Sequence, residues 1–250
     1  MKERSSWYSG RLGRDVSVVR WGTFGMPLLI FPTAGGDAEE IERFHIVSTL
    51  QEYLDAGRIK IYSCDSVAGK AMVIEEGSAQ HRMWLMNQFQ EFVRHELVPA
   101  IYTDCRTPGI DIVAAGSSIG AFNALAVVCR YPDVFSKALC MSGTYDLNRF
   151  LKAPPTGDFQ VSSPVHWLPG LQDGEHLARL RTRFVLLASG EGRAEDIGES
   201  WRVAGILGDK RIPNRVDSWG TEWAHDWPTW RNMLHTYMDE LFPADGAEVQ

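Results

Sequence analysis

The chain has 250 residues, of which 44% are hydrophobic and 23% are charged, and its formal net charge at pH 7 is −7. This length fits one large domain that buries about three-quarters of the surface of its unfolded form. The charge is modest and the basic residues form short clusters without a stripe, so nucleic acid is excluded as an expected partner. No run approaches the roughly 18 apolar residues that a membrane span needs, and the start Met-Lys-Glu-Arg lacks the apolar stretch of a secretory signal. We therefore expect no membrane association and a cytoplasmic location.

The first quarter of the chain predicts strands and a helix. Residues 16–21 and 28–31 are expected to form strands, and the turn between them predicts that the sheet begins with a hairpin. Apolar residues at helical spacing predict a helix over 38–54, and alternating Ile residues predict a strand over 58–64. A βαβ unit follows from this order.

The middle and end of the chain continue the alternation. A long amphipathic stretch over 80–102 leads into an apolar strand at 110–115 and a helix of small residues at 121–130. The remaining expected elements are strands at 138–141, 184–188 and 214–219 and helices near 200–207 and at 228–241. Alternating strands and helices predict the α/β class, with a mostly parallel sheet, helices on both faces and reactive loops at the carboxyl ends of the strands.

Residues 145–180 stand out as a long insertion rich in proline, glycine and aromatic side chains. A loop of this length within a domain is more often functional than not, so we expect a short lid or specificity loop. The alternative is a plain surface cover over one edge of the sheet. The sequence shows no internal repeat and no linker, so we expect residues 1–250 to form a single domain.

Residues 116–120 read Gly-Ser-Ser-Ile-Gly and match the pattern G-x-S-x-G. Their place between an apolar strand and a helix is the context in which this pattern presents a nucleophilic serine on a sharp turn. Gly and Ser are common residues, so the bare pattern also arises by chance as a structural turn. Its position favours Ser118 as the nucleophile.

A serine nucleophile needs a base within hydrogen-bond reach, and histidine suits that task at neutral pH. Four histidines follow Ser118 in the sequence. His166 and His176 precede the strand after which the acid normally lies, and His235 lies inside the last helix. His225 lies on the loop between the last strand and the last helix, where the chain returns over the strand ends, and we expect it to be the base.

The acid that would orient the histidine is less well defined. The loop after the strand at 184–188 offers Glu191, Glu195 and Asp196, and either Asp or Glu serves this role. We favour Glu195, followed by Asp196 and Glu191, with Asp146 after the preceding strand as a further alternative.

Stabilising the oxyanion of an acyl-transfer reaction requires two preorganised donors, and backbone N–H groups suit this role. The N–H of Ile119, directly after the serine, is one expected donor. The second is expected from the loop after the strand at 28–31, at Ala34, with Thr33 as the alternative. The neighbouring glycines at 35–36 are equally compatible with a flexible turn.

We expect neither a metal nor an organic cofactor. No His, Cys or Asp cluster has the spacing of metal ligands, and no glycine-rich phosphate loop is present. The four cysteines have no C-x-x-C spacing and are expected to be reduced structural thiols: Cys64, Cys105, Cys129 and Cys140.

Four segments together resemble the α/β-hydrolase superfamily, and more narrowly the bacterial putative esterases related to esterase D. They are the loop at 31–36, the elbow at 116–120, Ser-Gly-Thr-Tyr-Asp at 142–146 and the Trp-rich segment at 219–230. The likeness covers most of the chain. It implies an α/β-hydrolase fold and the hydrolysis of carboxylic esters or thioesters through an acyl-enzyme, with Ser118 as nucleophile and His225 as base.

The expected function is therefore that of a serine hydrolase acting on small-molecule esters with small to medium acyl groups. An acyltransferase would use the same residues, because only the acceptor of the acyl group differs. A catalytically silent hydrolase fold that serves as a binding module is a third interpretation. The sequence leaves the oligomeric state open, with a homo-oligomer as one option.

Overall fold

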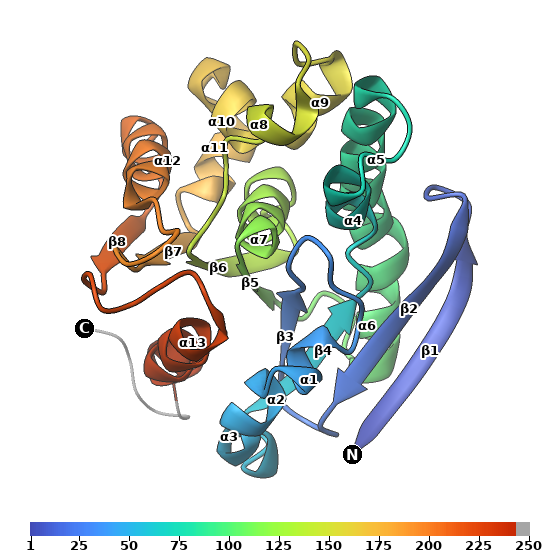
Figure 1. Ribbon diagram of the computed structural model, residues 1–250. Coiled ribbons are helices and arrows are strands. Elements are labelled where there is room, and N and C mark those ends of the chain that lie inside the picture. Colours follow the sequence, from blue (N-terminus) through green and yellow to red (C-terminus); the bar gives the residue numbers. More distant parts are fainter. Residues whose placement is uncertain (244–250) are drawn as a thin grey trace.

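The computed structural model describes residues 1–243, and an eight-stranded sheet runs through their centre (Figure 1). The strands lie in the order β1-β2-β4-β3-β5-β6-β7-β8. Their bounds are β1 Lys2–Ser9, β2 Arg14–Trp21, β3 Met26–Phe31, β4 Ile59–Cys64, β5 Ile112–Ser117, β6 Phe135–Met141, β7 Phe184–Ser189 and β8 Asn214–Ser218. The β1–β2 and β2–β4 pairs are antiparallel, and the other five neighbouring pairs are parallel. The predicted α/β class with a mostly parallel sheet is confirmed.

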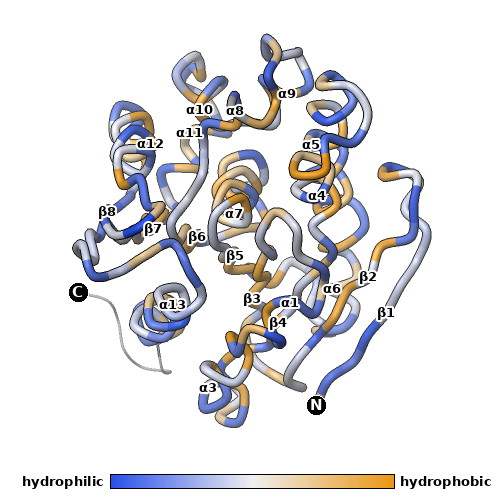
Figure 2. The backbone as a smooth tube through the Cα atoms, viewed as in Figure 1, coloured by the Kyte–Doolittle hydropathy of each residue, from blue (hydrophilic) through white to orange (hydrophobic). Residues whose placement is uncertain are grey.

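The predicted hairpin between the strands at 16–21 and 28–31 is wrong. β4 lies between β2 and β3, and the hairpin joins β2 to β1 instead, with Ser9 opposite Arg14. β1 escapes prediction because it is an edge strand whose side chains are mostly exposed and hydrophilic (Figure 2). β3 has five buried residues in six, which suits a central strand with neighbours on both sides.

Helices cover both faces of the sheet (Figure 1). On one face lie α1 Glu40–Arg43, α2 Ile46–Thr49, α3 Gln51–Asp55 and α13 Trp227–Leu241. The other face carries α4 Val67–Val73, α5 Ala79–Phe92, the π-helix Val93–Leu97, α6 Val98–Cys105, α7 Ile119–Arg130, α8 Asn148–Leu151, α9 Gly157–Ser162, α10 Pro164–Trp167, the 3₁₀ turn Leu168–Gly170, α11 Glu175–Leu180 and α12 Ile197–Asp209. Successive side chains of β3 point to opposite faces of the sheet and pack in two separate hydrophobic cores. Leu29 and Phe31 belong to one core, and Leu28 and Ile30 belong to the other.

Two helical regions differ from their prediction. The single helix predicted over 38–54 is three short helices, and the first break is at His45, which adopts the left-handed conformation with φ 66°. The segment 145–180, predicted to be irregular, instead contains α8 to α11. Local signals account for this, since Thr156 caps the N-terminus of α9 and Pro164 is the first residue of α10.

Candidate active site

Ser118 lies on the turn between β5 and α7, at the carboxyl end of a central strand. Its φ of 58° and ψ of −121° lie in a region that non-glycine residues rarely adopt. The backbone holds the turn on both sides, because Ser118 N donates to Met141 O at 3.0 Å and Thr144 N donates to Ser118 O at 3.2 Å. Such a conformation costs about 1–3 kcal/mol and persists where the surroundings over-determine it.

The two glycines of the motif allow this turn to pack against its neighbours. A Cβ on Gly120 would lie 2.5 Å from the carbonyl oxygen of Phe31, and one on Gly116 would lie 2.3 Å from the carbonyl carbon of Gly120. Both obstacles are backbone atoms, which have no rotamer to change. The glycines therefore place the start of α7 directly beside β3, next to the loop that follows β3.

His225 lies on the loop between β8 and α13, as the sequence predicts. Its N–H donates to Arg193 O at 3.0 Å, which ties this loop to the one that follows β7. The two loops pack backbone against backbone, since a Cβ on Gly190 would lie 2.1 Å from Trp223 O. Because β7 and β8 are neighbours in the sheet, both loops emerge at the same end of the molecule (Figure 1).

The contact between these loops brings Glu195 to the histidine. Glu195 Oε2 lies 3.5 Å from His225 Nδ1, and the Glu195 side chain is only 1% exposed, against 23% for His225. This separation exceeds an ordinary hydrogen bond, as catalytic contacts often do before substrate is bound. The arrangement places a buried carboxylate against one ring nitrogen and leaves the other side of a partly exposed imidazole for a second partner.

The other three carboxylates proposed as the acid have different partners. Glu191 accepts a hydrogen bond from Ser218 Oγ, and Asp196 caps the N-terminus of α12 by accepting from Gly198 N at 3.0 Å. Asp146 Oδ2 lies 3.7 Å from Arg202 Nη1 in an exposed ion pair. The structure therefore brings Glu195 alone among the four into contact with His225.

Three side chains that the sequence analysis did not assign surround the Glu195–His225 pair. Ser142 Oγ donates to Glu195 Oε1 at 2.5 Å and accepts from Trp230 Nε1 at 2.9 Å. Ser189 Oγ lies 3.3 Å from Glu195 Oε2. Ser142 directly follows β6 and Ser189 ends the neighbouring β7, which is a tertiary relationship that no local pattern reveals.

The other three histidines after Ser118 form polar contacts away from Glu195 and His225. His166 Nδ1 lies 2.9 Å from Ser163 Oγ, and burial lowers the pKa of His166, with the Arg202 charge acting in the same direction. His176 Nε2 lies 2.9 Å from Cys129 O. His235 lies on the exposed face of α13, 2.9 Å from Glu52. None of the three contacts Glu195.

In the loop after β3, the N–H groups of Ala34 and Gly35 have no acceptor among the described residues, whereas the Thr33 N–H is bonded. Thr33 N donates to Glu40 Oε2 and Thr33 Oγ1 donates to Glu40 Oε1, both at 2.7 Å, so the Thr33 N–H is already used. Within residues 1–243, the Ala34 N–H has no acceptor, and the Ile119 N–H is the first of α7 and has none inside the helix. Glu40 is 6% exposed, and burial raises its pKa against the lowering effect of its bonds to Thr33.

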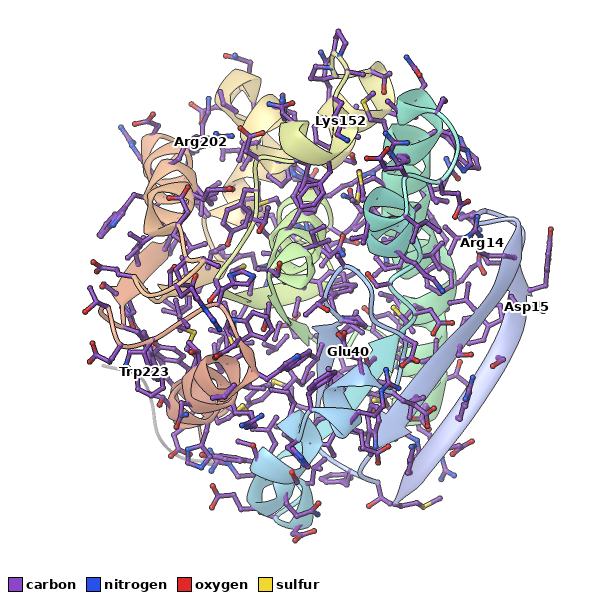
Figure 3. All side chains as sticks on the ribbon, in the orientation of Figure 1. Arg14, Asp15, Glu40, Lys152, Arg202 and Trp223 are labelled. Carbon is purple, nitrogen blue, oxygen red and sulfur yellow. The ribbon has the colours of Figure 1, made fainter. Side chains whose placement is uncertain are left out.

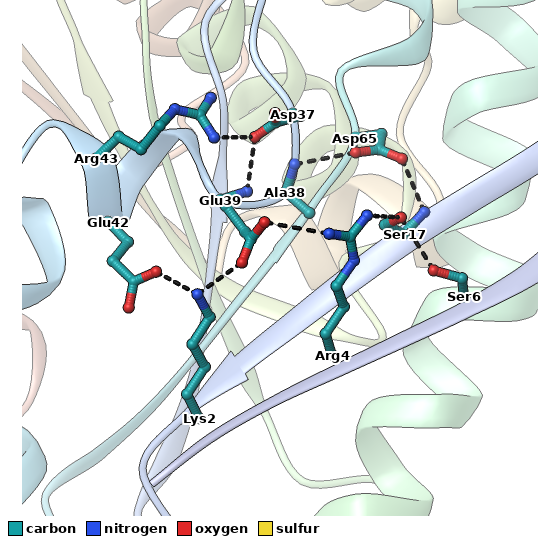
Figure 4. A network of polar contacts seen from close by, with 10 residues as sticks. All are labelled: Lys2, Arg4, Ser6, Ser17, Asp37, Ala38, Glu39, Glu42, Arg43 and Asp65. Carbon is teal, nitrogen blue, oxygen red and sulfur yellow. Dashed lines mark hydrogen bonds and ion pairs between the residues drawn. The ribbon is translucent and has the colours of Figure 1, made fainter.

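A second carboxylate fixes the far end of this loop. Asp65, directly after β4, accepts from Ala38 N at 3.0 Å and from Ser17 N at 2.8 Å (Figure 4). The same close-up shows Glu39 between Lys2 and Arg4, with which it forms ion pairs at the surface. Glu40 and Asp65 therefore fix the two ends of the loop, at Thr33 and Ala38. The ion pairs of Glu39 connect it to the edge strand β1.

Other cavities and clusters lie away from this region. A cavity of about 1170 Å³ is lined by residues such as Phe24, Arg58 and Lys60 at the opposite ends of β3 and β4, and neither Ser118 nor His225 lines it. In the described part of the chain, no three His, Cys, Asp or Glu side chains gather in a metal-binding arrangement. Across residues 1–243, no helix has the length and apolar character needed to cross a membrane.

The cysteines are free thiols with little reactivity expected. Cys64, Cys129 and Cys140 are fully buried and Cys105 is partly buried. Burial raises the pKa of Cys140 to about 12, and it raises the pKa of Cys64 and Cys129 well above the ordinary thiol range. Because the thiolate is the nucleophile, none of these three is suited to attack a substrate.

The geometry can be compared with known proteins. The family model described as "Putative esterase" matches residues 74–240, which include Ser118, Glu195 and His225. No curated protein is significantly similar to the chain in sequence.

Solved structures share the fold over almost the whole chain. A ferulic acid esterase is 16% identical with a TM-score of 0.74, over 97% of this chain and 98% of its own. The protein MPT51 of Mycobacterium tuberculosis is 17% identical with a TM-score of 0.68, over 98% of each chain. An S-formylglutathione hydrolase from Staphylococcus aureus is 11% identical with a TM-score of 0.63, over 97% of this chain and 96% of its own. At these identities the likeness shows a common fold.

Proposed function

The chain belongs to the family described as "Putative esterase" and has the α/β-hydrolase fold, and from this premise we propose that it hydrolyses carboxylic esters or thioesters with Ser118, His225 and Glu195 as a catalytic triad. The observation that carries the proposal is the contact between His225 Nδ1 and the buried Glu195 carboxylate, at the end of the sheet where Ser118 occupies its strained turn. Family membership supports the ester chemistry, and the geometry supports the assignment of the residues.

In the proposed reaction, His225 takes the proton of the Ser118 hydroxyl as the oxygen attacks the ester carbonyl. Glu195 holds the imidazole in the required tautomer and stabilises the imidazolium. The N–H groups of Ile119 and Ala34 bind the oxyanion that forms. His225 then gives its proton to the departing alcohol or thiol, which leaves an acyl group on Ser118.

Deacylation reverses the roles. His225 takes a proton from a water molecule, the resulting hydroxide attacks the acyl carbonyl, and the proton passes to Ser118 Oγ as the bond to the serine breaks. The free acid leaves and the enzyme returns to its first state. An alcohol in place of water would give a new ester, which is the acyltransferase outcome.

We assign the helical cover of residues 145–180 to substrate selection within this single domain. α8 is held to the end of α4 by an exposed ion pair between Lys152 and Glu75, 2.6 Å apart. Figure 3 shows Lys152 at the end of α8 and Arg202 on the neighbouring α12. The packing of α10 against α7, the helix that begins directly after Ser118, supports a role for this cover in selecting the acyl or alcohol group.

A panel of p-nitrophenyl esters of increasing acyl length tests the proposal, with the wild type compared with Ser118→Ala. We expect hydrolysis of short to medium esters and a loss of turnover of roughly 10⁶-fold in the variant, as in a triad enzyme that loses its serine. A fluorophosphonate probe should label the wild type and leave Ser118→Ala unlabelled. A folded wild type that neither turns over esters nor reacts with the probe would indicate a silent binding module, and new esters formed with added alcohols would indicate an acyltransferase. The cytoplasmic location stays a prediction, which cell fractionation can test, and light scattering can determine the oligomeric state that the sequence leaves open.

A further inference from the structure

The geometry points to Ser142 and Trp230 as positioning residues that hold Glu195 against His225. The inference rests on the proposed function, because it concerns the acid of that triad. Ser142 follows β6, whereas Trp230 belongs to α13, so the two are far apart in the sequence but lie on elements that pack against each other. They meet beside the Glu195 carboxylate through hydrogen bonds that run from Trp230 to Ser142 and from Ser142 to Glu195.

The chemistry of these groups fixes the direction of both bonds. An indole N–H can only donate, so Ser142 Oγ must accept from Trp230 Nε1 at 2.9 Å. A hydroxyl has one hydrogen, and an ionised carboxylate only accepts. The Ser142 hydrogen is therefore directed to Glu195 Oε1, 2.5 Å away, and rotation of the hydroxyl away from the carboxylate is opposed by the indole.

The second hydroxyl near the carboxylate is not committed in this way. Ser189 Oγ lies 3.0 Å from Gly190 O and 3.3 Å from Glu195 Oε2, so its single hydrogen has two acceptors and the nearer one is the carbonyl. Ser142 is thus the fixed donor to Glu195. Because hydrogen bonds to charged groups are stronger than neutral ones, this bond has the larger effect on the carboxylate's orientation.

The backbone of Ser142 supports a positioning role. Ser142 adopts a φ of 47°, a conformation that costs a non-glycine residue energy, and its N–H donates to Ala188 O at 2.8 Å. Glycine would suit this φ better, yet the side chain present is the one that reaches Glu195. The residue is 2% exposed and Trp230 is 4% exposed, so water does not compete for either group.

Trp230 also touches the histidine directly. Its ring meets the His225 ring edge to face, with 5.1 Å between centroids and an interplanar angle of 86°. One residue of α13 therefore supports both members of the pair, the imidazole by packing and the carboxylate through Ser142. A substitution of Trp230 should therefore change kcat through its effect on Glu195 and His225, with no contact between Trp230 and the substrate.

The test compares Ser142→Ala and Ser142→Gly, which both lose the hydroxyl but differ at the strained φ. We expect kcat to fall by about 10- to 100-fold in both variants, the size of effect for one lost hydrogen bond to a charged group, with KM changed by less than about threefold. The glycine variant should melt at a higher temperature than the alanine variant. If kcat instead follows the melting temperature and recovers in Ser142→Gly, the effect is structural and the inference is wrong.

Trp230→Phe removes the N–H and keeps a ring, and its matched control is Trp219→Phe, whose Nε1 donates to Tyr237 OH at 2.8 Å, away from Glu195. We expect a lower kcat for Trp230→Phe, an unchanged kcat for Trp219→Phe, and a Ser142→Ala/Trp230→Phe double variant no slower than Ser142→Ala, because both act through one bond. Ser118→Ala measured alongside separates the two proposals. If it loses activity while Ser142→Ala and Trp230→Phe keep the wild-type kcat, the inference alone fails, and if Ser118→Ala stays active, the proposed function fails.

Discussion

Glu195 and His225 face each other across two loops that follow neighbouring strands, with 3.5 Å between Glu195 Oε2 and His225 Nδ1. Each loop carries one member of the pair, and the backbone bond from His225 N to Arg193 O sets the spacing of the loops. The pair is thus a product of the sheet order, because β7 and β8 must lie side by side for the two side chains to meet.

Glu195→Gln should lower kcat by about 10⁴-fold, since a neutral amide no longer stabilises the imidazolium and permits the wrong tautomer. The matched control is Glu191→Gln, in the same loop, whose carboxylate instead accepts from Ser218 Oγ. Steady-state hydrolysis of a p-nitrophenyl ester measures both. Equal losses in the two variants, or a loss confined to Glu191→Gln, would contradict the assignment of the acid.

Glu40→Ala should slow catalysis through the loop after β3. The carboxylate binds both the N–H and the hydroxyl of Thr33, and without it the loop is free to shift Ala34. A misplacement of about 1 Å costs roughly 10²-fold in rate, so we expect a kcat reduced by up to that factor. Glu39→Ala, which removes an adjacent carboxylate from the exposed network of Figure 4, is the control and should keep its kcat. A normal kcat in a folded Glu40→Ala protein would show that the loop does not need this anchor.

The same carboxylate gives the stability a pH dependence. Burial raises the pKa of Glu40 above its ordinary value of 4.5, so the folded state binds this proton more tightly than the unfolded state does. The contribution of Glu40 to stability is therefore fullest below the ordinary value and is lost as the pH rises through the raised pKa. Glu40→Gln has no such titration, so its melting temperature relative to the wild type should rise between about pH 4 and pH 7. Melting curves that keep a constant offset across this range would contradict the prediction.

Local patterns predict the elements whose apolar residues recur at a regular spacing or form a short continuous run. β4, β7 and α13 lie close to their predicted places. The apolar residues of β4 and β7 are buried on both faces of the sheet, and those of α13 lie on its one buried side. β1 was missed because an exposed edge strand has no buried face to create a pattern. The break at His45 was missed because a left-handed residue other than glycine leaves no mark in the sequence.

The residues of the candidate site also differ in how far local sequence patterns predict them. The positions of Ser118 on the turn after β5 and of His225 on the loop before α13 could be predicted, because a tight turn demands glycines and the order of the loops follows from the order of the elements. The sequence favours Glu195 as the acid only by its place in the loop that it shares with Glu191 and Asp196, and the contact with the next loop is what distinguishes the three. The partners Ser142 and Trp230 depend on the sheet order and on the docking of α13, which no single segment encodes.

The close packing of the elbow at 116–120 can be tested with two glycine-to-alanine substitutions in helices, one in α7 and one in α12. Gly120→Ala places a Cβ 2.5 Å from the carbonyl oxygen of Phe31, which is backbone of a central strand and cannot yield, so we expect a loss of about 3 kcal/mol in the free energy of unfolding. Gly205→Ala in α12 meets no atom within 4 Å and should gain about 0.5–1 kcal/mol, because alanine loses less backbone entropy in a helix. Chemical denaturation measures both changes. Since Gly120 lies two residues from Ser118, Gly120→Ala should also lose ester hydrolysis under conditions where it remains folded, whereas Gly205→Ala should keep this activity. A stable, active Gly120→Ala protein would contradict the close packing of the elbow on β3.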